Sequence, residues 1–202
     1  LLAWRLQQAG QRFILIGSSS MPSAFRVAAG VINPVTGRWM TKTWNFDQIL
    51  PEAVETYCAI EQQFGIQVYR PIPEIRFCQN AEDLKRARRR MRNPRYHDVL
   101  SRMVAPGEAA PEFKDDFGSF HIDQAAYVDL PLVVHTLRAS FATQGQFRDE
   151  TFLHSDLQPA TSGWQYRDLR ADKVIFCEGV AMQDNPWFKN LPLKPAKGET
   201  LL

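Results

Sequence analysis

The sequence contains no apolar segment long enough to cross a membrane. A membrane-spanning helix needs about 18 or more apolar residues in succession, and polar or charged side chains interrupt every apolar segment of these 202 residues. The first ten residues also lack the basic start and the small-residue cleavage site of a signal peptide. We therefore expect neither an integral membrane segment nor a secretory leader.

The sequence also has little excess of charge of either sign. Its 24 lysines and arginines nearly balance its 22 acidic residues, and the net charge is +2. Proteins that bind nucleic acid usually have a strongly basic surface, so this balance predicts no nucleic-acid partner.

The three cysteines, Cys58, Cys78 and Cys177, form no CxxC pair. Their odd number and wide spacing indicate free, buried thiols in a reducing compartment, and we expect a cytoplasmic protein.

Motifs of metal and nucleophilic catalysis are absent as well. The sequence has no phosphate-binding P-loop and no GxSxG turn. Its four histidines, His97, His121, His135 and His154, show no metal-ligand spacing, so we predict no metal site. Glu178, which precedes a glycine, is a weak candidate for a catalytic carboxylate, because a strand that ends in glycine more simply marks a close approach of backbone. No catalytic residue is therefore assigned.

A folded core is nevertheless expected, since 45% of the residues are hydrophobic and 11% are aromatic. Periodicity predicts helices over residues 46–64, 81–91 and 127–142, and a surface excursion over residues 94–111. Alternating patterns predict strands of a half-exposed antiparallel sheet. These alternating strands are expected at residues 66–69 and 74–79. Further strands are expected at residues 118–122, 147–153 and 164–169, and a buried strand at residues 174–177.

The first twenty residues read as the second half of a βαβ unit. Leu1, Leu2, Leu6 and Ala9 recur at helical spacing, and residues 12–16 form a short apolar segment typical of a parallel strand buried on both faces. No capping residue precedes the helix. We therefore expect the chain to begin inside this unit, after the turn that would hold a dinucleotide pyrophosphate. From periodicity alone, an ordinary α/β domain without a cofactor is the alternative.

Three segments resemble one known family. Residues 18–39, SSSMPSAFRVAAGVINPVTGRW, are similar to the loop after the second Rossmann strand in FAD-dependent oxidoreductases of the D-amino-acid oxidase and glycine oxidase type. Residues 1–16 resemble the helix and strand before that loop. Residues 173–202 resemble the late strand, the glycine and the return into the substrate domain. The three segments occur in the family's order across nearly the whole chain.

The resemblance implies an α/β protein with an incomplete Rossmann-like FAD-binding domain and an inserted antiparallel α+β substrate domain. Residues 1–65 and 123–180 would form the FAD-binding domain. Residues 66–122 and 181–202 would form part of the substrate-binding domain. The implied cofactor is FAD, and the implied reaction is hydride transfer to the flavin from a small amine or amino acid. The resemblance does not indicate the oligomeric state.

The resemblance also implies where FAD would lie. Gly17 and Ser18 would lie at the ribose, Phe152 would contact the adenine through its backbone, and Gly179 would lie near the nucleotide. The pyrophosphate and the isoalloxazine would be followed by Ala24, Phe25, Arg26, Ala29, Gly30 and Val31.

Departures from the family pattern concern the same site. The acidic residue that holds the ribose in the family falls at Gly17, which has no side chain to offer. The glycine-rich turn and the family's C-terminal part are not in the sequence, so we expect weak FAD binding or none, and the activity of this chain by itself stays open.

The alternative function is a non-catalytic binding module that keeps the fold and binds an acidic partner. The helix at residues 81–91 would provide the contact, since residues 85–92 include a lysine and five arginines. A solvated helix face is the simpler interpretation of this basic segment.

Overall fold

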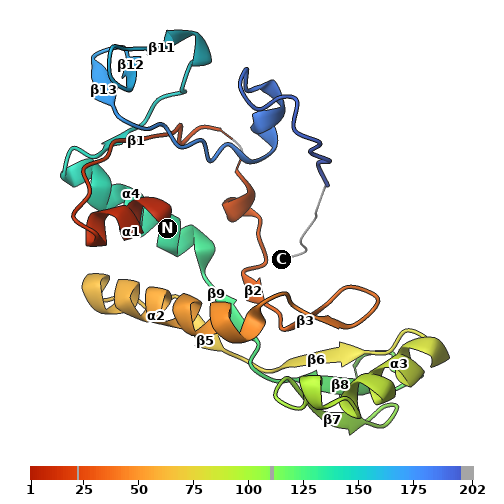
Figure 1. Cartoon of the computed structure of the whole chain (residues 1–202). Helices are drawn as coiled ribbons and strands as arrows, with labels where there is room; N and C mark the ends of the chain where they lie inside the picture. Colours follow the sequence, from red (N-terminus) through yellow and green to blue (C-terminus); the bar gives the residue numbers. More distant parts are fainter. Residues whose placement is uncertain (22, 110–111, 197–202) are drawn as a thin grey trace. The chain divides into compact units, whose positions relative to one another are not determined.

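The computed structural model describes residues 1–21, 23–109 and 112–196 (Figure 1). The chain divides into two compact units. Unit 1 comprises Leu1–Ser23 and Arg138–Leu202, and unit 2 comprises Ala24–Leu137. The division falls within helix α4, Leu130–Thr143. In the described part of the chain, no helix has the length and apolar character needed to cross a membrane.

Unit 1 is organised by a short parallel strand pair. Strand β1, Leu15–Ile16, pairs in parallel with β10, Phe147–Arg148, so that Leu15 faces Phe147. Helix α1, Leu2–Gln8, precedes β1, and the Gln7 side-chain amide donates to the side-chain oxygens of Gln144 and Gln146 just before β10. The first and the later segments of unit 1 are therefore joined both by backbone and by side chains.

The rest of unit 1 is an antiparallel meander followed by irregular chain. Its strands occur in the order β11–β12–β13. The elements are η3 (His154–Asp156), β11 (Leu157–Pro159), β12 (Trp164–Tyr166), β13 (Leu169–Ala171) and η4 (Gly179–Asp184).

Unit 2 is built on two three-stranded antiparallel sheets, β2–β9–β5 and β6–β8–β7, and a hairpin, β3–β4. The β strands are β2 (Val31–Ile32), β3 (Val35–Thr36), β4 (Thr41–Lys42), β5 (Tyr69–Pro71), β6 (Glu74–Phe77), β7 (Leu100–Val104), β8 (Ser119–Ile122) and β9 (Ala126–Val128). The helices are η1 (Ala24–Arg26), α2 (Phe46–Phe64), α3 (Ala81–Met91) and η2 (Pro94–Tyr96).

The core of unit 2 lies where α3, the β3–β4 hairpin and the β6–β8–β7 sheet meet (Figure 1). Ala87 of α3 and Phe120 of β8 are both completely buried there. Helix α3 begins where the Asn80 side chain accepts a hydrogen bond from the backbone N–H of Asp83, a standard N-cap. The remaining members of the core cluster are Val35, Met40, Phe46, Cys78, Tyr96, Val99, Leu100 and Ile122.

Two long helices and the antiparallel strands agree with the sequence prediction. Helices α2 and α3 occupy residues 46–64 and 81–91 as predicted. Strand β6 lies within the predicted strand at residues 74–79, whereas β5 shares only Tyr69 with the predicted strand at residues 66–69. Both belong to antiparallel sheets, as predicted. Periodicity succeeded for α2 and α3 because each is long enough to present a continuous apolar face.

The predicted surface excursion at residues 94–111 is wrong for residues 94–104, and residues 110–111 lie outside the described residues. Tyr96 and Val99 are buried, and β7 pairs as an edge strand with β8, the central strand of its sheet. The predicted helix at residues 127–142 begins later, at Leu130, because residues 126–128 form strand β9. Asp129 marks the change, since its carboxylate accepts a hydrogen bond from the backbone N–H of Leu132.

The two predicted buried strands of unit 1 also need correction. Residues 174–177 form no strand in the described part of the chain, and Ile175 is 58% exposed. Of residues 12–16, only Leu15 and Ile16 form a strand, and both are half-buried. A short apolar segment specifies strand propensity but not a partner strand, so the burial of these two segments was overestimated.

The cysteines also differ from the prediction. Two of those expected to be buried, Cys58 and Cys177, are exposed.

Gly30 provides a test of the β2–β9 pairing. Its φ is +70°, and a Cβ at this position would lie 2.1 Å from the carbonyl oxygen of Val128. We expect Gly30→Ala to lower the free energy of unfolding by about 2 kcal/mol or more, measured by urea denaturation. Gly65→Ala is the matched control, because Gly65 has a similar φ of +64° but open space around it. An equal loss in both variants would contradict the proposed clash.

Candidate functional site

The carboxyl ends of β1 and β10 lie at the same edge of the parallel pair. Gly17 and Ser18 follow β1, and Asp149 follows β10. The backbone N–H of Gly17 donates to the carbonyl of Arg148 at 3.1 Å, and that of Ser19 donates to Asp149 Oδ1 at 2.7 Å. Ligands of open α/β sheets bind beyond the carboxyl ends of the strands. We call residues 17–20 together with Asp149 the carboxyl edge.

The carboxyl edge combines hydroxyl groups with one carboxylate. Ser18 Oγ and Ser20 Oγ lie 2.8 Å apart. Hydrogen bonds from the backbone N–H and then the hydroxyl of Ser19 lower the pKa of Asp149, so this exposed carboxylate is ionised at neutral pH. Such a set can accept hydrogen bonds from the hydroxyl groups of a ligand.

Ion pairs tie the parallel strands to the meander. The Arg148 guanidinium donates to both carboxylate oxygens of Asp168, at 2.7 and 2.6 Å. The hydrogen bonds from Arg148 lower the pKa of Asp168 to about 2. In the same way Arg167 donates to Glu150 and Asp156, each at 2.8 Å. The orientation of β10, and so of Asp149, therefore depends on side chains from the β12–β13 turn.

A small aromatic pocket of about 150 Å³ lies elsewhere in unit 1. Trp164 and Trp187 meet edge to face with ring centroids 5.9 Å apart, and Phe176 stacks on Trp187 at 5.6 Å. The cavity is smaller than the several hundred Å³ of an ordinary ligand pocket. Its lining comprises Leu157, Trp164, Val174, Phe176, Trp187 and Phe188.

Next to these rings is a polar triad. His154 Nε2 lies 2.7 Å from Glu178 Oε1, and the amide of Asn185 donates to Glu178 Oε2 at 2.7 Å. Asn185 is completely buried, and its own oxygen accepts the backbone N–H of Trp187 at 2.9 Å. The triad orients the His154 ring and fixes the turn that begins with Gly179.

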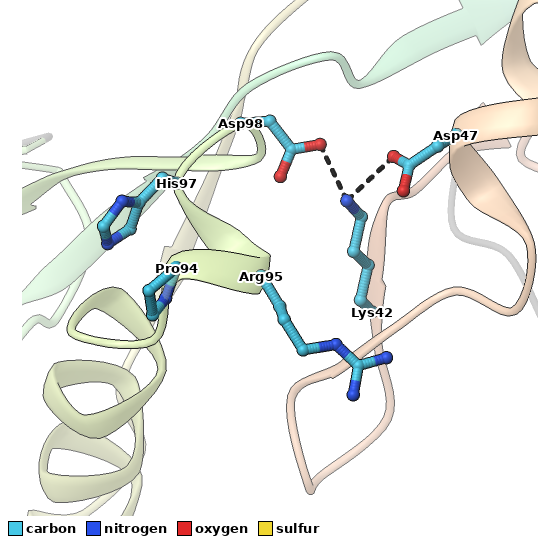
Figure 2. Close-up of a pocket in the computed structure, with 6 residues that line it drawn as sticks. All are labelled: Lys42, Asp47, Pro94, Arg95, His97 and Asp98. Atoms are coloured by element: carbon cyan, nitrogen blue, oxygen red, sulfur yellow. Dashed lines mark hydrogen bonds and ion pairs between the residues drawn. The ribbon is translucent and has the colours of Figure 1, made fainter.

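Unit 2 contains a polar pocket of about 370 Å³, drawn in Figure 2. Lys42 of β4 reaches between Asp47 and Asp98, with its Nζ at 2.8 and 2.7 Å from their carboxylates, while the His97 ring points away. Burial disfavours the ammonium, but the hydrogen bonds to Asp47 and Asp98 outweigh it and raise the pKa of Lys42. Lys42 is therefore a protonated cross-link between segments at neutral pH, and not a base or a nucleophile.

Four of the residues predicted at the FAD site lie in unit 1. Gly17 and Ser18 belong to the carboxyl edge. Phe152 stacks on Tyr166 with ring centroids 4.4 Å apart, and Gly179 opens η4 beside the triad. Unit 1 thus brings Gly17 and Ser18 together, whereas Phe152 and Gly179 lie near the aromatic pocket.

The other six predicted residues form one segment of unit 2 leading into β2. Ala24, Arg26 and Ala29 are exposed, and Val31 is 55% exposed. The half-buried Phe25 lies under the Arg26 guanidinium, 5.7 Å from ring centroid to Cζ. Gly30 has a structural explanation within unit 2, since its φ and the nearby Val128 carbonyl both require glycine.

Sequence reasoning missed Asp149 and the triad. Asp149 follows a strand whose parallel partner is far away in the sequence, so only the pairing of β1 with β10 reveals its position. His154 was treated as isolated because Glu178 and Asn185 are distant in sequence. Among the described residues, no group of three or more histidine, cysteine, aspartate and glutamate side chains lies close enough to hold a metal ion.

The parallel pair β1–β10, the preceding helix α1 and the antiparallel sheets make this a mixed α/β protein with several sheets. The sequence model of the FAD dependent oxidoreductase family matches residues 1–202. The chain therefore belongs to the FAD dependent oxidoreductase family, as the resemblance of its three segments indicated.

Among solved structures, the chain is similar to iminodiacetate oxidase from Chelativorans sp. BNC1. The TM-score is 0.58 and the sequence identity is 20%, over 80% of this chain. The matched region spans 46% of the oxidase, so the chain corresponds to about half of that protein. At this identity the likeness concerns the fold: a mixed α/β protein with several sheets.

The Arg148–Asp168 pair makes a prediction for pH dependence. We expect Arg148→Gln to return the pKa of Asp168 from about 2 toward its usual 3.8, because the hydrogen bonds from the guanidinium are lost. A pKa lowered on folding stabilises the folded state above pH 3.8, and this contribution disappears as the pH falls through 2. NMR titration of the side-chain carboxyl carbon measures the change.

The control for this titration is Arg167→Gln. Arg167 is the last and smallest influence on Asp168, and it donates instead to Asp156 and Glu150. The Asp168 titration should barely move in this variant. An equal shift in both variants would show that general positive charge, and not the bidentate pair, lowers the pKa.

Proposed function

We propose that the protein is an FAD-dependent oxidoreductase that oxidises a small amine or amino acid by hydride transfer to the flavin. The match of the family model over residues 1–202 is the observation on which this proposal rests. The likeness in fold to a protein named iminodiacetate oxidase supports it. We propose the same domain boundaries as the sequence predicted, with residues 1–65 and 123–180 for FAD and residues 66–122 and 181–202 for substrate.

The carboxyl edge fits the adenosine half of FAD. A Cβ added at Gly17 would have only Arg138 Nη2 near it among the described residues, at 3.8 Å, so a ligand can approach the backbone there. The Asp149 carboxylate lies on the adjoining strand end and is ionised. We assign it the hydrogen bond to a ribose hydroxyl that Gly17 cannot provide, with the Ser18 hydroxyl beside it.

The remaining contacts follow the sequence prediction. The exposed segment from Ala24 to Val31 would lie along the pyrophosphate and the isoalloxazine, where its small residues allow close approach of backbone N–H groups. Phe152 would contact the adenine and Gly179 would lie near the nucleotide. FAD, when bound, would accept the hydride from the carbon next to the substrate nitrogen. The chain's own residues would bind and orient the two partners.

Two further expectations belong to the same proposal. The three cysteines are free thiols, of which Cys58 and Cys177 are exposed, and exposed thiols suit the reducing cytoplasm. In the polar pocket of unit 2, both carboxylates already form ion pairs with Lys42, so we assign this pocket no substrate group.

The first test is an absorbance scan of the purified protein before and after addition of FAD and desalting. We expect bands near about 370 and 450 nm, the signature of bound oxidised flavin, to appear with added FAD and to weaken on desalting, because the glycine-rich turn that would hold the pyrophosphate is not in the sequence. Anaerobic addition of amines and amino acids should then bleach the longer-wavelength band for the true substrate. If the protein holds neither flavin from purification nor added FAD, the non-catalytic binding module is the remaining function. If no amine or amino acid bleaches the bound flavin, the proposed substrate class is wrong.

The second test concerns Asp149. We expect Asp149→Asn to weaken FAD binding by about tenfold, because a charge-assisted hydrogen bond to the ribose becomes a neutral one. Asparagine can still accept the backbone N–H of Ser19, so the loop should keep its conformation. FMN lacks the adenosine half, and its affinity should not change. Flavin fluorescence quenching measures both affinities.

The matched control is Asp172→Asn, an exposed carboxylate outside the carboxyl edge. It makes the same change in net charge and should leave FAD affinity as in the unaltered protein. Equal losses in the two variants would show a general electrostatic effect and remove Asp149 from the site.

A further inference from the structure

Helix α3 presents a stripe of four exposed cations on one face. Lys85 lies four residues before Arg89, and Arg88 lies four residues before Arg92, the C-cap, so the four side chains share one side of the helix. None of the four forms an ion pair with a carboxylate of the described residues. We call these four residues the basic stripe.

Packing in the core explains the apolar residues on the opposite side of α3, but it does not explain the cations of the stripe. Ala87 is completely buried in the core, and Leu84 and Met91 pack against it. The helix dipole favours cations in the last turn, whereas like charges spaced by three or four residues repel each other. The stripe therefore costs the isolated helix stability, and an anionic partner would remove that cost.

A tryptophan lies against α3, at the side that carries Arg86 and Arg90. The guanidinium groups of Arg38 and Arg86 lie over the Trp39 ring, at 4.8 and 4.9 Å from its centroid. Arg86 and Arg90 also donate to the carbonyl oxygens of Arg38 and Trp39, at 3.0 and 3.1 Å. The tip of the β3–β4 hairpin is thus fixed to α3, yet 56% of the Trp39 side chain is exposed.

We propose that the basic stripe and Trp39 together dock the protein on the surface of a membrane that contains anionic lipids. Clustered lysines and arginines are attracted to anionic head groups. Tryptophan is enriched at membrane interfaces, where its ring is partly buried and its N–H stays hydrated. This surface lies entirely within unit 2 and includes none of the residues proposed to contact FAD.

The composition of the surface favours a lipid over other anionic partners. A single-stranded nucleic acid needs several aromatic rings on which successive bases stack, and Trp39 is a single ring held by arginines. A stable protein partner needs an apolar centre of contact, whereas the stripe is charged along its whole length. A lipid surface needs only the charges and one interfacial side chain.

The test is sedimentation of the purified protein with lipid vesicles. We expect the protein to pellet with phosphatidylcholine vesicles that contain phosphatidylglycerol, and not with phosphatidylcholine alone. Binding should fall when salt is raised from about 0.1 M to about 1 M, because the Debye length shortens from about 10 to about 3 Å. Equal binding to both kinds of vesicle would overturn the proposal.

Variants assign the binding to the stripe. The combined variant Lys85→Gln, Arg88→Gln, Arg89→Gln and Arg92→Gln should lower the bound fraction by about tenfold or more. The matched control removes the same charge from exposed positions in unit 1. It combines Arg12→Gln, Lys173→Gln, Lys189→Gln and Lys194→Gln.

The control variant should bind vesicles as the unaltered protein does, and both variants should keep the unaltered melting temperature. If both variants lose vesicle binding equally, net charge and not the basic stripe determines the binding, and the assignment to the stripe is wrong. Trp39→Ser should lower vesicle binding without changing its dependence on salt. If a single-stranded oligonucleotide displaces the protein from the vesicles, the stripe is a nucleic-acid site and the lipid proposal is wrong.

Discussion

The parallel pairing of β1 with β10 is the constraint on which unit 1 depends. It is only two residues long, and it joins the first segment of the chain to one that follows helix α4. The pairing places two strand ends at one edge, and Asp149 then faces the loop after β1. Without it, Ser19 and Asp149 would have no reason to meet, and the proposed adenosine contact would not exist.

Such a short pairing needs support from side chains, and arginine provides much of it. Arg148 holds Asp168 through a bidentate pair, and Arg167 joins two further carboxylates. In unit 2 other arginines bind backbone carbonyls, as Arg76 and Arg86 do at the β3–β4 hairpin. The fork of the guanidinium suits both tasks, because it offers several donors in one plane.

The basic stripe differs from these arginines in having no partner of opposite charge among the described residues. One helix therefore contains two kinds of cation. Arg86 and Arg90 stabilise the fold through the hairpin, and the stripe faces outward. The contrast explains how a chain with a net charge of only +2 can still present a strongly basic surface.

Local patterns determined the parts of the fold with long elements. The apolar periodicity of residues 46–64 and 81–91 specifies helices, and the three segments at residues 1–16, 18–39 and 173–202 were enough to indicate the FAD dependent oxidoreductase family, which the match over residues 1–202 then showed. Tertiary structure decided the rest. Residues 100–104 enter a sheet, residues 174–177 form no strand, and Asp149 and Glu178 find partners far away in the sequence. The physical reason is that helix formation depends on neighbours along the chain, whereas strand burial and polar clusters depend on which distant segments meet.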